Sequence, residues 1–150
     1  YSRIGLTSDA QRFSPDTDIA AQVRKEVADR GPDDPQLACV LVDEAQFLTS
    51  QQVWQLARLT DRDDIPVICY GLRTDFQGRL FPGSAELLGI ADKLVEMKAV
   101  CHCGRKATMN QRVDDAGNPV TDGAQTEIGG NERYVAVCRR HFVRSPQAPI

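Results

Sequence analysis

Two short groups of thiol and imidazole side chains could bind a metal ion. Cys101-His102-Cys103 forms the first group and Cys138-Arg139-Arg140-His141 the second, with residues 104–137 between them. Three thiolates and one imidazole suit a closed tetrahedral zinc site, and a zinc whose four positions are all filled by protein is structural. We predict that the ligands are Cys101, Cys103, Cys138 and His141. His102 is the alternative imidazole, and the competing interpretation is three free thiols beside two surface histidines.

A pair of adjacent acids follows an apolar segment earlier in the chain. The run 37–42 is apolar and ends at Asp43 and Glu44. P-loop enzymes present a carboxylate to the magnesium ion of a bound nucleotide at the end of such a strand, which suggests that role for Asp43. Glu44 would then be free to accept a proton or to position a nucleophile. The alternative is that the acids only cap a helix.

The surrounding pattern predicts the elements that would hold these acids. We expect a first helix capped by Ser14, with Pro15 in its first turn, that ends at Gly31-Pro32. The run 37–42 reads as a strand buried on both faces, and 65–72 as a second one. Between them, Thr49 and Gln52 have the spacing of a capping box. A right-handed strand–helix–strand unit would bring Asp43, Glu44 and segment 72–77 to the same edge of the sheet.

The pattern changes in the last third of the chain. A short helix at 85–88 and a strand-like stretch at 93–100 are followed by polar, Gly-rich sequence from Cys101 to His141. Such a segment has too few apolar residues for a core of its own, so a bound metal would have to hold it together. We therefore predict two domains, residues 1–97 and residues 98–150.

Composition excludes several classes of partner. The chain is 41% hydrophobic and 26% charged, with a formal net charge of −3 and a pI near 5.4. This balance gives no basic surface for a nucleic acid. No apolar run approaches the roughly 20 residues of a membrane-spanning helix. We expect a cytoplasmic protein that binds neither nucleic acid nor a membrane.

Four segments in order resemble one family. The runs VLVDEAQFL, IPVICYGLRTDFQGRLF, CHCGRKATMNQR and IGGNERYVAVCRRHF resemble the bacterial thymidine kinases of the zinc-containing P-loop type, and the resemblance extends from about Leu37 to Phe142. It implies an α/β fold, with a parallel-sheet, RecA-like P-loop core that binds nucleotides and a small zinc-ribbon domain that carries a lasso-like loop.

The resemblance also implies a reaction. The γ-phosphate of ATP would be transferred to the 5′-hydroxyl of thymidine or deoxyuridine, giving dTMP in nucleotide salvage. Glu44 would be the general base and Asp43 would support the magnesium ion that accompanies ATP. Feedback inhibition by dTTP and a homotetramer are further expectations of the resemblance.

A nucleoside pocket is implied as well. Its side chains would be Phe47, Leu72, Phe76, Phe81, Asn110 and Tyr134. The backbone of Gln125, Thr126, Ile128 and Gly129 would contact the thymine edge and the sugar. Several of the apolar residues could instead be plain core, and Tyr134 a simple strand residue.

One family feature is missing from these residues. No G-x-x-x-x-G-K-[ST] occurs among them, so the cradle for the β- and γ-phosphates is absent. We expect the first strand, the P-loop and the first helix of the family to precede Tyr1. We also expect the 150 residues to be inactive by themselves, since phosphoryl transfer depends on that cradle.

Two other functions fit parts of the pattern. A helicase-type ATPase also carries D-E-A-Q after an apolar strand, but such motors need two large lobes and a basic channel for nucleic acid. The other candidate is a non-catalytic zinc-ribbon binding module. Its contact surface would consist of Arg105, Lys106, Arg112, Arg133, Arg139 and Arg140.

Overall fold

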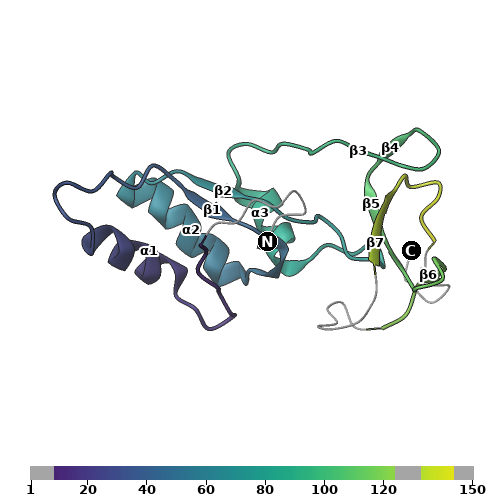
Figure 1. Cartoon of the computed structure of the whole chain (residues 1–150), viewed down its shortest axis with the longest axis horizontal. Helices are drawn as coiled ribbons and strands as arrows, with labels where there is room; N and C mark the ends of the chain where they lie inside the picture. Colours follow the sequence, from purple (N-terminus) through teal and green to yellow (C-terminus); the bar gives the residue numbers. More distant parts are fainter. Residues whose placement is uncertain (1–8, 124–132, 144–150) are drawn as a thin grey trace.

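The computed structural model describes residues 9–123 and 133–143. Helices and a parallel strand pair gather at one end of the molecule, and short antiparallel strands gather at the other (Figure 1). The first group contains α1 (Ile19–Ala28), β1 (Val40–Val42), the 3-10 helix η1 (Ala45–Phe47), α2 (Ser50–Asp63), β2 (Val67–Cys69) and α3 (Pro82–Ile90). The second contains β3 (Ala99–Val100), β4 (Lys106–Ala107), β5 (Met109–Val113), β6 (Pro119–Val120) and β7 (Arg133–Val137).

The predicted strand–helix–strand unit is present. β1 and β2 are parallel, with Leu41 opposite Ile68, and α2 connects them along the chain. Two further bonds extend the pairing past the strand ends, from Tyr70 N–H to the Val42 carbonyl and from Ala45 N–H to the Tyr70 carbonyl, both at 2.8 Å. The chain therefore reaches the acidic pair at the carboxyl edge of this small sheet, as the apolar run predicted. A larger RecA-like sheet stays a prediction, because the described residues supply only two parallel strands.

Burial of both faces of these strands was expected, and that expectation is wrong for the described residues. Val42 is buried on the face toward α2, whereas Leu41 and Ile68 on the opposite face are 62% and 46% exposed. The main core lies between the helices and the inner face of the strands. Its buried members are Ile19, Ala20, Val42, Ala45, Leu48, Val53, Leu56, Leu59 and Ile65.

The sequence predicted the N-terminal cap of α2 correctly and that of α1 incorrectly. α2 has the predicted capping box, in which Gln52 N–H donates to Thr49 Oγ1 and Thr49 N–H donates to Gln52 Oε1. α1 is capped by Asp18 rather than by Ser14, because the Asp18 carboxylate accepts the Ala21 N–H at 2.9 Å. Ser14 instead closes a turn with Thr17 just before the helix.

The antiparallel strands form two small sheets. β3 pairs with β4, and β5 lies between β6 and β7. Two hydrogen bonds join this part to segment 72–81 of the first group: Arg73 donates to the Thr108 carbonyl and Asn110 donates to the Thr74 carbonyl. The boundary at residue 97 stays a prediction. Among the described residues, no helix is long and apolar enough to cross a membrane.

Candidate active site and metal centre

Glu44 lies at a sharp turn between β1 and η1. Its backbone adopts the left-handed conformation, with φ 53° and ψ 36°, and its N–H donates to Asp43 Oδ1 at 2.9 Å. A left-handed residue other than glycine costs about 1–3 kcal/mol, and such residues gather at functional sites. Both carboxylates are exposed. The turn therefore presents two adjacent acids to solvent at the carboxyl edge of the sheet.

A cavity of about 330 Å³ lies against this turn. It is lined by Gln11, Arg12, Phe13, Asp43, Glu44 and Phe47. The cavity thus combines two carboxylates with one cationic side chain and two aromatic rings. That combination can receive a ligand with an apolar ring at one end and an ionisable or hydroxyl group at the other.

Segment 72–81 approaches the same edge as a small hairpin. Thr74 bridges to Leu80, and the buried carboxylate of Asp75 accepts the N–H groups of Gln77 and Arg79 at 2.9 and 2.8 Å. These bonds shape the tip of the hairpin from within. Asp75 is consequently turned inward, whereas Glu44 faces solvent.

β5 contacts this hairpin with one face. Asn110 donates to the Thr74 carbonyl at 3.1 Å, and the Arg112 guanidinium lies 3.9 Å from the centroid of the Phe76 ring. Arg112 also donates to the Asp122 carbonyl. Tyr134 lies directly opposite Arg112 on β7, and directly opposite residues of antiparallel strands share a face. Asn110, Arg112 and Tyr134 therefore belong to the face of the sheet that meets the hairpin.

The predicted pocket residues fall into two groups. The rings of Phe47 and Phe81 meet edge to face with centroids 5.8 Å apart, next to the Glu44 turn. Phe81 and Phe76 are 4% and 0% exposed, whereas Phe47 and Tyr134 are 44% and 47% exposed. Of these four aromatic residues, Phe47 and Tyr134 are thus the exposed ones, and Phe47 alone lines the cavity at Glu44. Gln125, Thr126, Ile128 and Gly129 lie outside the described residues.

The four predicted metal ligands come together. One donor atom from each of Cys101, Cys103, Cys138 and His141 lies within 4.8 Å of the others. The Sγ atoms of Cys103 and Cys138 are 3.9 Å apart, and His141 Nδ1 is 3.5 Å from the Sγ atoms of both Cys101 and Cys138. A tetrahedral zinc ion with ordinary bond lengths separates two sulfurs by about 3.8 Å and a sulfur from a nitrogen by about 3.5 Å. These residues can therefore hold a metal ion of the size and geometry of zinc.

The surroundings favour a thiolate at Cys101. Backbone N–H groups of Cys103 and Cys138 donate to its sulfur and lower the pKa of the thiol to about 5. A thiolate is the form that binds metals. His102 is exposed, its ring lies tilted by 31° against that of His141 with centroids 4.4 Å apart, and its Nδ1 is 3.7 Å from Cys101 Sγ. It lies beside the four-residue cluster rather than within it.

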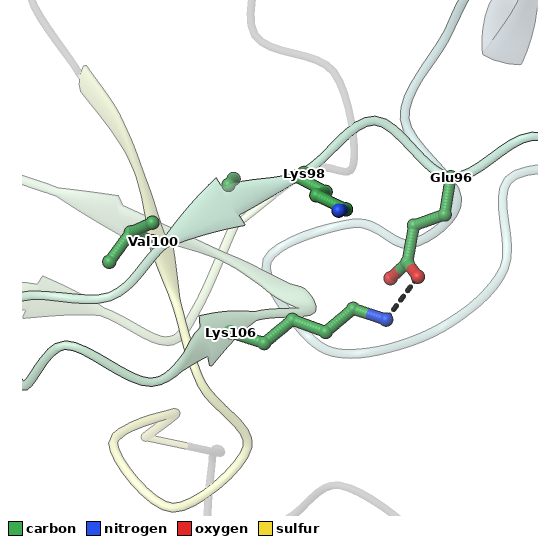
Figure 2. A pocket seen from close by; sticks show the side chains of 5 residues that line it. Glu96, Lys98, Val100 and Lys106 are labelled. Carbon is green, nitrogen blue, oxygen red and sulfur yellow. Dashed lines mark hydrogen bonds and ion pairs between the residues drawn. The ribbon is translucent and has the colours of Figure 1, made fainter.

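A second cavity, of about 310 Å³, lies beside β3 and β4. Its lining residues are Glu96, Lys98, Ala99, Val100 and Lys106, and an ion pair between Lys106 and Glu96 spans it (Figure 2). Both members of the pair are about half exposed, and exposed pairs of this kind contribute about 1 kcal/mol or less. This hollow carries neither paired carboxylates nor an aromatic ring, so the cavity at Glu44 is the better candidate for chemistry.

Sequence reasoning missed two residues near the site. Gln46 is 2% exposed, and its side chain donates to the Glu44 carboxylate. Arg112 had been placed among the basic residues of a possible contact surface, which is wrong, because it is 2% exposed and faces Phe76. Neither residue has a local signature, since an amide after an acid pair and an arginine in a polar strand are usually exposed.

Comparison with known proteins bears directly on this arrangement. The thymidine kinase family model matches residues 1–142. A thymidine kinase of Novosphingobium aromaticivorans is 66% identical over 94% of this chain and 71% of its own length. Thymidine kinases of Idiomarina loihiensis and Agrobacterium fabrum are each 58% identical, over 94% and 96% of this chain and 70% and 72% of their own lengths. With the acidic turn, the hairpin and the Cys3His cluster spread along the matched residues, the chain belongs to the thymidine kinase family of enzymes.

Proposed function

We propose that the natural polypeptide that carries these 150 residues transfers the γ-phosphate of ATP to the 5′-hydroxyl of thymidine or deoxyuridine. Family membership supports thymidine and ATP as the substrates. The observation that carries the proposal is the exposed, left-handed Glu44 turn, which opens into a cavity that also contains Phe47. In this proposal the products are dTMP and ADP.

The proposed chemistry assigns one task to each acid. Glu44 accepts the proton of the 5′-hydroxyl as that oxygen attacks the γ-phosphorus and the bond to ADP breaks. Asp43 lies one residue earlier and would help to hold the magnesium ion that neutralises the phosphates. The G-x-x-x-x-G-K-[ST] motif that grips those phosphates is not among these residues, so the proposal for this chain concerns the nucleoside side of the reaction.

We assign the nucleoside pocket to the surface between the Glu44 turn and β5. A flat thymine ring suits the exposed rings of Phe47 and Tyr134, and Phe81 packs edge to face against Phe47. Leu72 would add an apolar contact and Asn110 a polar one. The backbone of residues 125–129 remains part of the proposal through the family resemblance alone.

The Cys3His cluster has a structural role in this proposal. Zinc bound by Cys101, Cys103, Cys138 and His141 would have no open position for water, as is usual for a structural site. It would join the β3–β4 hairpin to the end of β7. This metal-linked part, residues 98–150, is the second proposed domain. Inhibition by dTTP and a homotetrameric state are proposed on the family resemblance only.

The test measures product and binding together. The natural polypeptide is incubated with ATP, magnesium and thymidine, and dTMP is quantified by chromatography, while thermal shifts are recorded with thymidine, dTTP and single-stranded DNA. We expect dTMP and stabilisation by the nucleoside and the nucleotide. ATP hydrolysis that depends on single-stranded DNA without dTMP would favour the helicase-type function instead.

A further inference from the structure

Gln46 has a buried side-chain amide whose nitrogen and oxygen both form hydrogen bonds. It lies in η1 and is 2% exposed. Its Nε2 donates to Glu44 Oε2, and its Oε1 accepts the N–H of Leu72 at 3.1 Å. Because the Leu72 N–H can only be matched by an oxygen, this second bond determines that the NH₂ end of the amide faces Glu44.

The packing around Gln46 leaves its side chain little room to move. A Cβ added at Gly71 would lie 2.7 Å from Gln46 Oε1 and 3.0 Å from its backbone nitrogen. At Gly83, an added Cβ would lie 2.6 Å from the Ala45 carbonyl oxygen and 2.7 Å from that of Leu48. The segment just after β2 and the first turn of α3 thus both pack closely against η1. Only glycine fits at either contact.

Glu44 has the opposite character. Its carboxylate is exposed, and a long side chain in water samples several rotamers. A hydrogen bond from a rigid, buried amide selects one of them. A bond from an amide N–H to a carboxylate is also charge-assisted, which makes this selection stronger than a bond between two neutral groups would.

We propose that Gln46 is a positioning residue, which holds the Glu44 carboxylate in its working orientation and ties it to the Leu72 backbone. This inference rests on the proposed function of Glu44 as the base. Ser84 Oγ donates to the Leu72 carbonyl at 2.6 Å, so both polar groups of the Leu72 backbone are held. Glu44, the proposed base, and Leu72, one wall of the proposed nucleoside pocket, are thereby held in a fixed position relative to each other.

The substitution Gln46→Glu separates this role from packing. A carboxylate oxygen can still accept the Leu72 N–H, but the donor to Glu44 is replaced by a second acidic group. Like charges disfavour joint ionisation. We expect the acid limb of the pH–rate profile to move to higher pH by about one unit or more, and kcat at pH 7 to fall roughly 10- to 100-fold. The Kd of thymidine should change less than about threefold, because the substitution removes no contact that binds the substrate equally in the ground state and the transition state.

Gln55→Glu is the matched control. Gln55 is 8% exposed in α2, and its Oε1 accepts the Ile19 N–H at 2.9 Å, a bond that glutamate can also make. The same change of charge is thus made in the same core, away from Glu44. The other charged groups that line the cavity with Glu44, Asp43 and Arg12, are unchanged in both variants. We expect Gln55→Glu to leave the pH–rate profile in place.

A second readout does not depend on turnover. With ¹³C-labelled glutamate side chains, the Glu44 signal is assigned by its loss in Glu44→Gln, and its titration is followed in the natural polypeptide and in both variants. The midpoint should rise in Gln46→Glu and not in Gln55→Glu. Equal midpoints and equal pH–rate profiles in the two variants would overturn the inference. If the natural polypeptide makes no dTMP, the proposed function fails, while the Glu44 midpoint still decides whether Gln46 controls this carboxylate.

Discussion

The guanidinium of Arg112 lies over the ring of Phe76, 3.9 Å from its centroid, and both side chains are almost completely buried. This contact joins β5 to the hairpin that follows β2. Arg112 also donates to the Asp122 carbonyl, and a Cβ on Gly123 would lie 2.5 Å from Arg112 Nη2. One arginine therefore connects the hairpin, the central strand of the small sheet and the segment that follows β6.

Replacement of Arg112 by methionine tests this connection. Methionine keeps much of the length and apolar contact but removes the cation over Phe76 and the donor to Asp122. We expect the free energy of unfolding to fall by about 2 kcal/mol, measured by urea denaturation. Arg58→Met, at an exposed position on α2, is the control and should change stability by about 0.5 kcal/mol or less. Equal effects in the two variants would contradict a linking role for Arg112.

Replacement of Glu44 by glutamine tests the proposed base. Glutamine keeps the size and the acceptor for Gln46 but cannot take the proton of the 5′-hydroxyl. We expect kcat to fall by about 10²–10⁴-fold, with a much smaller change in thymidine affinity. Steady-state kinetics and calorimetric titration of thymidine measure the two quantities. Turnover within a few-fold of the unsubstituted enzyme would remove Glu44 from the mechanism.

The backbone at Glu44 predicts a separate effect on stability. Both Glu44→Ala and Glu44→Gly remove the carboxylate and its bond to Gln46, so their difference reports on the backbone alone. At φ 53°, alanine is strained and glycine is not, and the glycine variant should be more stable by about 1 kcal/mol. Urea denaturation at pH 7 provides the comparison. In an ordinary right-handed helix the order is reversed, so a more stable alanine variant would refute the left-handed turn.

The two histidines near the cysteines should respond differently to substitution. His141→Ala removes a proposed ligand, whereas His102→Ala removes a ring that packs against His141 and places its Nδ1 3.7 Å from Cys101 Sγ. We expect about one zinc per chain in His102→Ala and well under one in His141→Ala and Cys103→Ser, measured by elemental analysis of purified protein. Loss of the metal should also speed hydrogen exchange in β5 and β7. Zinc retained by His141→Ala and lost by His102→Ala would reassign the ligand.

Local spacing determined the parts of this protein whose interactions span few residues. The capping box of α2 follows from Thr49 and Gln52, and the parallel pair β1–β2 follows from two apolar runs on either side of a helix. The Cys3His cluster was also predictable, because each of the two short groups supplies two residues that bind metals, and a four-ligand site leaves few ways to choose among them. The acidic pair could be placed at the sheet edge for the same reason, since a strand of known direction ends there.

Tertiary structure alone decided how these parts act together. No local pattern indicates that Arg112 and Gln46 are buried, whereas Arg58 and Gln51 on α2 are exposed. Their burial depends on partners far away in the sequence, Phe76 for Arg112 and Leu72 for Gln46. The left-handed residue Glu44 likewise directly precedes η1, which packs closely against Gly71 and Gly83, two residues distant in the sequence. The residue type determines which interactions a side chain can make, and packing against distant segments determines which of those interactions form.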